Sequence, residues 1–240
     1  MIHPTAIVES NSIGKNVEIM EYVIIRKYAV IGDAVTIHPF SIIEEGVTIG
    51  DGVEVFPHAY IGKKPKGPGL ANKPFYEKYA KIGSYSVIGP NAVICYGTTV
   101  GENSMISDGV SIRENCSIGN NCIIGRNVTI NFGTTIGNCS RVMDLSHITA
   151  RAEIGDNVFV GPGVSSADDD SMGRGANYNP EEDKGAHIEN GVSIGEGCVI
   201  LPRVTIGSDS IIGAGTVVRR SIKKDMLVIG NQELLKNKLK

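Results

Sequence analysis

Residues 100–130 read VGENSM ISDGVS IRENCS IGNNCI IGRNVT I, and every six-residue unit begins with Ile or Val. The same phase holds over residues 7–61, 82–160 and 188–218, so that thirty positions spaced six apart all carry Ile or Val. The second residue of a unit is often Gly and the fifth is usually small. A period of six is too short for ordinary helices and predicts short strands, because alternate residues of a strand point to the same side.

One such unit cannot bury a core by itself, so neighbouring units must stack as a solenoid. If three units make one triangular coil, thirty units give about ten coils, with a rise of about 4.8 Å per coil. The glycines allow the bends between strands. The pattern predicts an all-β fold, a parallel β-helix over residues 1–222. Residues 223–240 are expected to form a C-terminal cap made of a strand and a short helix.

Composition agrees with this fold and restricts the function. The chain has 240 residues, 5% aromatic residues and no Trp, as expected for a narrow interior of Ile and Val. Its net charge of −3 does not favour nucleic acid as a partner. No apolar run has the length of a membrane span, and the N-terminus lacks the signal-peptide pattern. We therefore expect a cytoplasmic protein without membrane insertion.

The cysteines and histidines do not suggest a metal site. Cys116, Cys122 and Cys198 occupy the small fifth position of their units, and the sequence has no CxxC pair. Buried packing is the expected role of these three side chains. The five His residues never lie within five positions of one another, whereas a zinc site needs at least three protein ligands. We expect no metal, which disfavours a β-helix carbonic anhydrase.

Two segments interrupt the period, residues 62–81 and residues 165–187. Loops on a rigid scaffold commonly carry binding residues. The first segment combines lysines with aromatic rings, which suit the phosphates and the base of a nucleotide. The second segment is acidic and suits a cationic amine or sugar hydroxyls. The substrate-binding candidates on the two segments are Tyr76, Lys78, Tyr79, Asp168, Asp169 and Arg174.

Together with the hexads, two runs carry a family resemblance: IHPTAIVESNSIGKNVEI at residues 2–19 and GVSIGEGCVILPRVTIGSDSIIGAGTVV at residues 191–218. Over nearly its whole length the chain resembles the left-handed β-helix acyltransferases. The resemblance implies a left-handed coil, against the right-handed rule for parallel crossovers. It also implies acyl-coenzyme A (acyl-CoA) as the co-substrate and a homotrimer with active sites between subunits.

A second stretch, SHITARAEIGDNVFVGPGVSSADDDSMGR at residues 146–174, narrows the resemblance. It is similar to the nucleotide-linked amino-sugar N-acetyltransferases. The implied reaction moves an acyl group, usually acetyl from acetyl-CoA, to the amino group of a deoxy amino sugar carried on dTDP or UDP. The implied pathway is surface glycan synthesis, such as that of lipopolysaccharide or O-antigen.

One departure from the family decides between acceptors. The related UDP-sugar O-acyltransferases carry a base His in an H-x-x-H arrangement; here the first His matches His147, and the base position is Ala150. A hydroxyl needs a base during attack, whereas a neutral amine is already a nucleophile. An amine acceptor is therefore favoured. An O-acyltransferase, with another base such as His187, and a non-enzymatic scaffold remain as alternatives.

Coil arithmetic suggests where the acceptor binds. Positions eighteen residues apart should stack, and polar residues gather on the face that holds Ile148. Two side chains near the strand ends of this face, Arg113 and Glu114, are candidates for substrate binding. The catalytic candidates, which would hold and deprotonate the amine, are Asp144, His147 and Asn131. Ordinary outward-facing polarity is the alternative role for each of these residues.

The donor is expected beside the C-terminal coils. A pantetheine arm is narrow and suits a wall of small residues, and basic side chains suit the phosphates of coenzyme A. The donor-binding candidates are Gly161, Gly163, Ser193, Arg203, Arg219 and Lys223.

Overall fold

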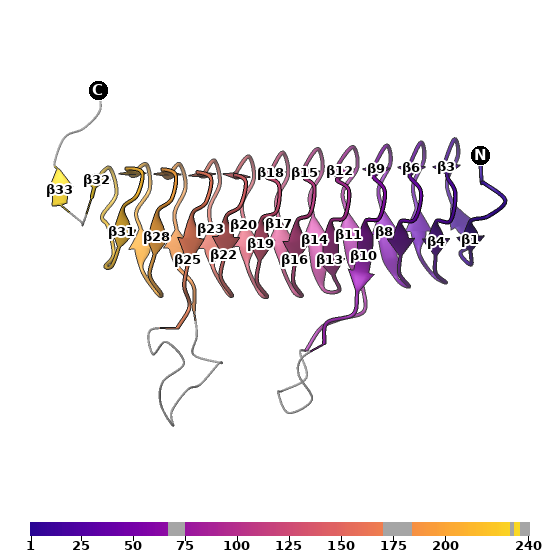
Figure 1. The fold of residues 1–240 in the computed structure, drawn as a ribbon, viewed down its shortest axis with the longest axis horizontal. Coiled ribbons are helices and arrows are strands. Elements are labelled where there is room, and N and C mark those ends of the chain that lie inside the picture. Colours follow the sequence, from indigo (N-terminus) through magenta and orange to yellow (C-terminus); the bar gives the residue numbers. More distant parts are fainter. Residues whose placement is uncertain (67–74, 170–183, 231–232, 236–240) are drawn as a thin grey trace.

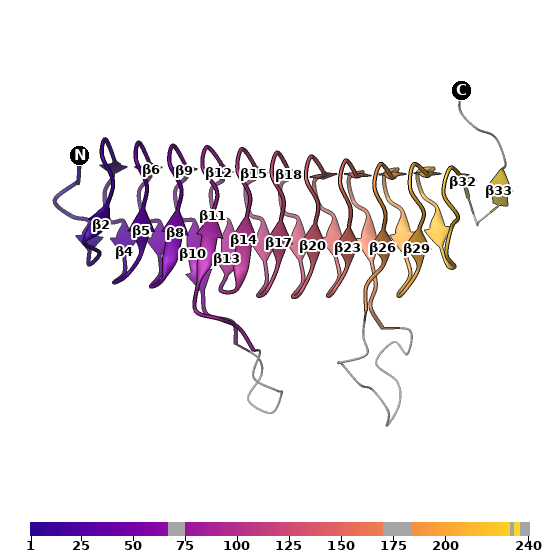
Figure 2. The same cartoon turned by 180° about the vertical axis from the view of Figure 1, so that it is seen from behind.

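The computed structural model describes residues 1–66, 75–169, 184–230 and 233–235, and within them the chain forms one straight prism (Figure 1). Short strands, most of them two residues long, alternate with tight corners and build three sheets. Each coil contributes one strand to each sheet, and the same arrangement is visible from behind (Figure 2). The predicted all-β parallel β-helix is confirmed.

The three sheets are named A, B and C. Sheet A contains β3 (Glu18–Ile19), β6 (Thr36–Ile37), β9 (Glu54–Val55), β12 (Val87–Ile88), β15 (Met105–Ile106), β18 (Ile123–Ile124), β21 (Arg141–Val142), β24 (Phe159–Val160), β27 (Ser193–Ile194), β30 (Ile211–Ile212), β32 (Leu227–Ile229) and β33 (Glu233–Leu235). Sheet B contains β1 (Ile7–Val8), β4 (Ile24–Ile25), β7 (Ile42–Ile43), β10 (Tyr60–Lys63), β13 (Val93–Cys95), β16 (Ser111–Ile112), β19 (Thr129–Ile130), β22 (His147–Ile148), β25 (Ser165–Ser166), β28 (Val199–Ile200) and β31 (Val217–Val218). Sheet C contains β2 (Ser12–Ile13), β5 (Val30–Ile31), β8 (Val47–Ile49), β11 (Ala80–Ile82), β14 (Thr98–Val100), β17 (Ser117–Ile118), β20 (Thr135–Ile136), β23 (Glu153–Ile154), β26 (His187–Ile188) and β29 (Thr205–Ile206).

The register confirms three hexads per coil. Ile112 pairs with Ile130, eighteen residues later, and Ile130 pairs with Ile148. Sheet B counts 11 strands, so the described chain makes about eleven turns rather than the expected ten. The first coil is one residue short, because Val8 rather than Ile7 pairs with Ile25. The side chain of Ile7 is consequently 52% exposed, and the hexad phase does not hold at that position.

The C-terminal cap differs from the expectation. The strand is confirmed as β32, but residues 233–235 form β33, which pairs antiparallel with β32. The predicted short helix is not confirmed, since the described residues contain no helix and residues 236–240 lie outside them. The edge of β32 offers unpaired backbone groups, and a strand satisfies them better than a helix does.

The core is a column of Ile and Val that runs the length of the prism. The second residue of most strands points inward, and side chains such as Ile94, Ile112 and Ile124 have no exposed surface. Small residues fill the space beside them at the corners. Buried hydroxyls there donate to backbone carbonyls of the next coil, as Ser140 Oγ does to the Gly155 oxygen at 2.8 Å. Every buried side-chain N or O atom of the described residues has a hydrogen-bond partner.

Three cysteines take the same place as those buried hydroxyls. The Sγ atoms of Cys116, Cys122 and Cys198 each lie 3.1 Å from a carbonyl oxygen of the next coil. Burial raises the pKa of the Cys116 thiol to about 12. The expected buried packing of these cysteines is confirmed. Cys95 is also buried, whereas Cys139 lies exposed at a corner.

This difference predicts the outcome of thiol labelling. A maleimide or disulfide reagent should modify one thiol per chain in the native protein at neutral pH, because only the exposed Cys139 meets the reagent. Cys139→Ser should abolish the fast reaction, and unfolding in denaturant should release the other four thiols. Mass spectrometry after timed labelling measures both. Rapid labelling of Cys116 in the folded protein would contradict the packing described above.

Candidate functional site

Both interruptions of the coil leave the prism at one edge. The first lies between β10 of sheet B and β11 of sheet C, and the second between β25 of sheet B and β26 of sheet C. We call this edge the B–C corner. Figure 1 shows the two loops on the same side of the prism. Their strand boundaries place them at residues 64–79 and 167–186, slightly shorter than the sequence predicted.

Between the loops the B–C corner carries two guanidinium groups that lie over one aromatic ring. The Cζ atoms of Arg113 and Arg151 lie 5.3 and 5.1 Å from the centre of the Phe132 ring. Arg113 also donates to Glu114, from Nε to Oε2 at 3.1 Å and from Nη2 to Oε1 at 2.6 Å. Glu114 is 3% exposed. The predicted pair Arg113 and Glu114 therefore lies between the loops and is joined by a two-point ion pair.

Ala150 occupies the next coil of this corner and is 1% exposed. The returning arm of the second loop lies on it, because the Gly185 N–H donates to the Ala150 carbonyl at 3.0 Å. A Cβ atom on Gly185 would lie 2.9 Å from that oxygen and 2.9 Å from the Ala152 Cβ. The position at which the family resemblance places a base thus holds a covered methyl group.

The three catalytic candidates lie near sheet B but bind different neighbours. Asp144 sits where the chain passes from sheet A to sheet B, and its Oδ1 accepts the Arg126 N–H at 2.9 Å. Side-chain hydrogen bonds from Arg126 hold the pKa of Asp144 below its usual range. His147 Nδ1 lies 2.7 Å from Thr129 Oγ1. Asp144 is therefore a poor base, because its charged form is already stabilised.

Asn131 follows β19 and lies toward the B–C corner, one coil before Thr149. Its backbone oxygen accepts from the Cys116 thiol. Asn131 and His147 therefore share the sheet B face that leads to the corner, whereas Asp144 lies at the far edge of that sheet. The structure thus places Asn131 and His147 on neighbouring coils of sheet B, with Asp144 apart from them.

Two of the three binding candidates on the first loop contact the rest of the protein and so fix the loop in place. The Tyr76 ring stacks on Tyr96, with ring centres 5.9 Å apart and planes 1° apart. Tyr96 donates its hydroxyl to the Glu45 oxygen at 2.9 Å, and burial raises its pKa. Lys78 forms an ion pair with the Glu45 carboxylate. Tyr76 and Lys78 thus anchor the loop, and Tyr79 remains as its predicted binding residue.

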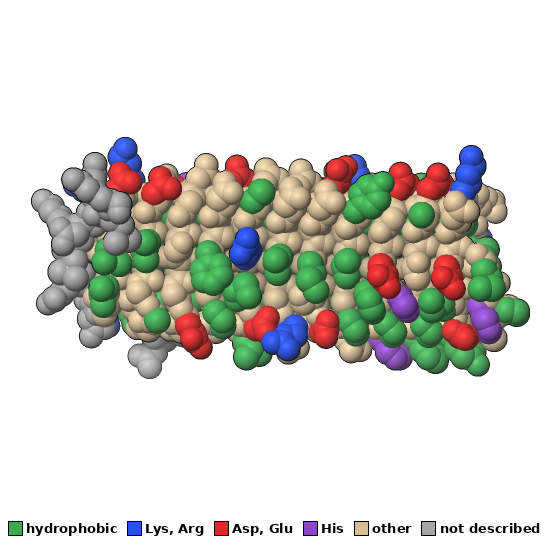
Figure 3. Space-filling view, turned by 90° about the horizontal axis from the view of Figure 1, so that it is seen from above, with side chains coloured by type: hydrophobic (Ala, Val, Ile, Leu, Met, Phe, Trp, Pro, Cys, Tyr) green, Lys and Arg blue, Asp and Glu red, His purple; other side chains and the backbone are tan. Residues whose placement is uncertain are grey.

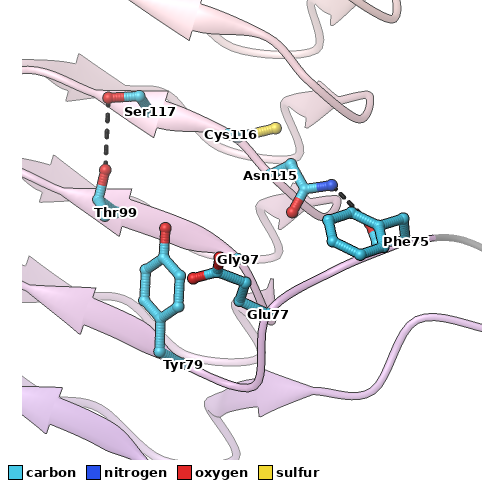
Figure 4. Close-up of a pocket in the computed structure, with 8 residues that line it drawn as sticks. All are labelled: Phe75, Glu77, Tyr79, Gly97, Thr99, Asn115, Cys116 and Ser117. Carbon is cyan, nitrogen blue, oxygen red and sulfur yellow. Dashed lines mark hydrogen bonds between the residues drawn. The ribbon is translucent and has the colours of Figure 1, made fainter.

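A pocket of about 400 Å³ lies between the returning arm of this loop and sheet C (Figure 4). It is lined by Phe75, Glu77, Tyr79, Gly97, Thr99, Asn115, Cys116 and Ser117. The Asn115 amide donates to the Phe75 oxygen at 2.6 Å, and Thr99 Oγ1 lies 3.3 Å from Ser117 Oγ. Sequence reasoning named only Tyr79 here. The available signal was the recurrence of hydroxyl residues eighteen positions apart in sheet C.

The second loop is described only at its ends. Asp168 and Asp169 follow β25 at the B–C corner and are partly buried, whereas Arg174 lies outside the described residues. On the returning arm, Lys184 Nζ lies 2.9 Å from Glu153 Oε1. The acidic and basic ends of this loop therefore flank the same corner.

The donor-binding candidates do not form one groove. Gly161 faces the next coil, since a Cβ there would lie 2.8 Å from the Glu196 nitrogen, while Gly163 has open space around it. Ser193 points outward from sheet A, beside Phe159. The remaining candidates lie at or beyond the far end of sheets B and C: Arg203, Arg219 and Lys223. Hexad position alone does not distinguish the three faces, and this is why the set is scattered.

Sheet C carries a hydrogen-bonded pair of a histidine and a glutamate that sequence reasoning did not find. His187 begins β26 and stands in register with Glu153 of β23. Its Nδ1 lies 2.8 Å from Glu153 Oε2. Hydrogen bonds from Lys184, and then from His187, hold the pKa of Glu153 below its usual range. The sequence could not reveal this pair, because 34 residues and the whole second loop separate the partners.

Other kinds of site find no support in the described part of the chain. It contains no group of three or more His, Cys, Asp or Glu side chains arranged to hold a metal ion. It also contains no helix long and apolar enough to cross a membrane. The face turned away from the loops carries apolar and His side chains that gather near the N-terminal end (Figure 3). In those first coils rings stack in pairs, such as Phe40 with His58.

Fold and site together define a hexapeptide-repeat β-helix with a polar corner bounded by two loops. The chain matches the family described as bacterial transferase hexapeptide (six repeats) over residues 28–63, 79–113, 97–131, 133–165 and 185–220. The chain therefore belongs to the bacterial transferase hexapeptide family.

Individual relatives match shorter parts of the chain. A galactoside O-acetyltransferase of Lactococcus lactis subsp. lactis (strain IL1403) is 39% identical over 66 residues, which are 28% of this chain and 30% of that protein. A putative acetyltransferase of Schizosaccharomyces pombe (strain 972 / ATCC 24843) is 47% identical over 45 residues, 19% of this chain and 22% of that one. These matches span less than a third of either curated relative.

Solved structures share the fold over nearly the whole chain. The Arabidopsis UDP-N-acetylglucosamine acyltransferase superposes with a TM-score of 0.63 at 21% identity, covering 100% of this chain and 75% of that one. The Bacteroides fragilis 9343 enzyme of the same name gives a TM-score of 0.51 at 25% identity, covering 95% and 70%. The similarity at this level of identity concerns the fold.

Proposed function

We propose that the protein is an acyltransferase that moves an acyl group from acyl-CoA to the amino group of a nucleotide-linked deoxy amino sugar. Acetyl-CoA is the proposed usual donor, and dTDP or UDP carries the sugar. Membership of the transferase family supports the reaction class. The curated relatives that are named as acetyltransferases support the transfer of an acetyl group.

The observation that carries the choice of an amine is the burial of Ala150. A hydroxyl acceptor needs a base at the reacting atom, and at this corner the base position is a methyl group that is 1% exposed. Gly185 binds the Ala150 carbonyl through its backbone N–H, so the returning arm of the second loop packs against this residue. An amine attacks a thioester without a base at that position and can lose its proton later.

Charge and aromatic surface between the loops support a nucleotide sugar. The guanidinium groups of Arg113, which is paired with Glu114, and of Arg151 both lie over the Phe132 ring, and guanidinium groups suit a diphosphate. The pocket beside Tyr79 has the aromatic and hydroxyl groups that suit a base or a sugar ring. Asn131 and His147 supply further polar contacts toward the same corner. Asp168 and Asp169 suit the cationic amine, and Gly163, Arg203 and Arg219 remain proposed contacts of the donor.

The setting proposed for this reaction follows the family resemblance. It includes a homotrimer with sites between subunits, a cytoplasmic location and a role in surface glycan synthesis. A hydroxyl acceptor is the second candidate function. It is favoured by the pairing of His187 with Glu153, which supplies a base away from Ala150, and by the galactoside O-acetyltransferase relative.

A thiol-release assay separates these candidates. Acetyl-CoA would be offered with a panel of dTDP- and UDP-linked amino sugars and with their hydroxyl counterparts. We expect turnover with an amino sugar and none with its hydroxyl analogue. Turnover confined to hydroxyl acceptors would reject the amine proposal, and absence of both turnover and acetyl-CoA binding by calorimetry would favour a scaffold.

A further inference from the structure

We infer that Glu114 is a positioning residue, which holds the Arg113 guanidinium in one orientation so that the B–C corner selects a diphosphate over a monophosphate. The inference rests on the proposed function and deepens it, because it states which part of the nucleotide sugar this corner recognises. Arg113 and Arg151 make the phosphate contacts, and Glu114 acts through Arg113. Glu114 thus takes an indirect role in place of the direct substrate contact expected from the sequence.

The Glu114 carboxylate is enclosed by the protein. Its side chain is 4% exposed, whereas the Arg113 side chain is 43% exposed. Burial raises the pKa of the Cys95 thiol, and the charge of Glu114 raises it further, so the carboxylate lies near this buried group. A ligand at the surface therefore meets Arg113 and not Glu114.

The pairing of Arg113 with Glu114 fixes the plane of the guanidinium. Nε donates to Oε2 at 3.1 Å and Nη2 donates to Oε1 at 2.6 Å, the two-point geometry that orients an arginine. Within the described residues no other hydrogen bond reaches this guanidinium. The N–H groups of Nη1 and the second N–H of Nη2 are therefore available to a ligand, and Glu114 sets their directions.

A second cation shares the same ring. Arg113, Phe132 and Arg151 lie on three successive coils, in the turns that follow β16, β19 and β22. Both Cζ atoms lie close to the centre of the Phe132 ring, at 5.3 and 5.1 Å, so one ring brings the two guanidinium groups into the same small area. A diphosphate can give one phosphate group to each arginine through charge-assisted hydrogen bonds, whereas a monophosphate has only one group to offer.

Glu114 also limits the attraction of this corner for anions in general. Its charge offsets one of the two positive charges, and a corner with less net charge depends more on the directions of its N–H groups. Selection of a ligand needs a disadvantage for the wrong ligand as well as contacts for the right one. Loss of the carboxylate should therefore weaken the oriented contacts and strengthen the unselective attraction.

A second Arg–Glu pair at the B–C corner provides a matched control. Arg26 follows β4 and Glu9 follows β1, on the coils before the first loop. Arg26 Nη1 donates to Glu9 Oε1 at 3.2 Å, and this is a single contact. The Glu9 side chain is 34% exposed. This pair has the same residue types as Arg113 and Glu114, but it lacks the burial and the two-point geometry.

The first test compares ligand binding in the full-length wild type and in Glu114→Gln by isothermal titration calorimetry. The ligands are UDP against UMP, and dTDP against dTMP. We expect the wild type to bind one of the diphosphates at least about tenfold more tightly than its monophosphate, the effect of one further hydrogen bond to a charged group. In Glu114→Gln this ratio should fall to about one, while Glu9→Gln should keep the wild-type ratio.

Two outcomes would overturn the inference. One is a wild type that does not prefer either diphosphate, and the other is a Glu114→Gln variant that keeps the wild-type ratio. A merely structural role of Glu114 would weaken both ligands of a pair equally and so would also keep the ratio. The thermal midpoint of each variant shows whether the fold is retained.

Arg113→Lys separates orientation from charge and leaves Glu114 with a cation. Lysine keeps the positive charge but lacks the planar fork that forms a two-point pair. The ratio of diphosphate to monophosphate affinity should therefore fall in this variant as it does in Glu114→Gln. A Lys variant with the wild-type ratio would show that charge alone attracts the phosphates, and would reject the positioning role.

Kinetics with the acceptor identified by the panel adds a second readout. In Glu114→Gln the KM for the nucleotide sugar should rise about tenfold, while kcat and the KM for acetyl-CoA stay unchanged, because the lost contact serves ground state and transition state alike. A lower kcat with an unchanged KM for the acceptor would contradict the inference.

Failure of the inference can be distinguished from failure of the proposed function. The nucleotide titrations need no acyl transfer. A diphosphate preference that depends on Glu114, together with no turnover of any amino sugar, would uphold the inference and reject the proposed reaction. Turnover of a nucleotide-linked amino sugar, together with a nucleotide preference that ignores Glu114, would do the reverse.

Discussion

Replacing Gly101 with Ala should lower the free energy of unfolding by about 3 kcal/mol, from overpacking and a lost hydrogen bond together. A Cβ at this position would lie 2.5 Å from the Gly119 carbonyl carbon and 2.6 Å from the Asn120 nitrogen. Both are backbone atoms of the next coil and cannot move alone. The same Cβ would push away the Asn120 side chain, whose Oδ1 accepts the Glu102 N–H at 2.8 Å.

Calorimetry or circular dichroism should report the change as a thermal midpoint lower by about 8 °C for a chain of this size. Gly215→Ala is the control: Gly215 has φ of +70°, and no atom lies within 4 Å of its added Cβ. That variant should lose only about 1 kcal/mol, the cost of a side chain in the left-handed region. Equal losses for the two variants would show that the spacing between coils is not the cause.

Arg113→Met should be the most damaging single change at the B–C corner. It leaves the Glu114 carboxylate, whose side chain is 4% exposed, without its cation. Removing one partner of a buried ion pair costs roughly 3 kcal/mol, because the remaining charge has lost water and gained nothing in exchange. Chemical denaturation with urea should show this loss as a lower midpoint with an unchanged slope.

Two further variants identify the cause. The double variant Arg113→Met with Glu114→Met should recover most of the stability, since apolar side chains of similar volume then fill the site. Arg126→Met breaks an exposed pair with Asp144, in which 68% of the Arg126 side chain is accessible, and should hardly change the midpoint. If the double variant were as unstable as Arg113→Met, packing of the arginine stem on Phe132 rather than charge would explain the loss.

Most of the fold could be predicted from the sequence because the period of six is visible without knowledge of long-range contacts. It predicted three hexads per coil, the Ile and Val interior, and the approximate boundaries of both loops. It failed at the ends of the prism, where no second neighbour enforces the phase. Val8 replaces Ile7 in the register of the first coil, and residues 233–235 extend sheet A instead of forming the expected helix.

The candidate site was harder to predict, because its geometry depends on which of three faces a residue occupies. Coil arithmetic could place Arg113 and Glu114 at one corner of the prism, and their role as substrate contacts stays a prediction. Tyr76 was expected to meet a ligand, but its ring packs on Tyr96. His187 and Glu153 come together only because the second loop returns to the next coil, a fact that no spacing of eighteen residues contains.

Both loops extend from the same edge of the prism, the B–C corner. The turns that follow β13, β16, β19 and β22 lie between the two loops along this edge. Their separation is therefore five coil steps, about 24 Å at the usual distance between strands. The distance between the loops can change only by whole coils, so it takes a series of fixed values. Deleting or inserting eighteen residues between the loops would shift that span by about 4.8 Å while leaving every face in phase. A change of one coil would therefore alter the distance between the loops without changing which side chains face the B–C corner.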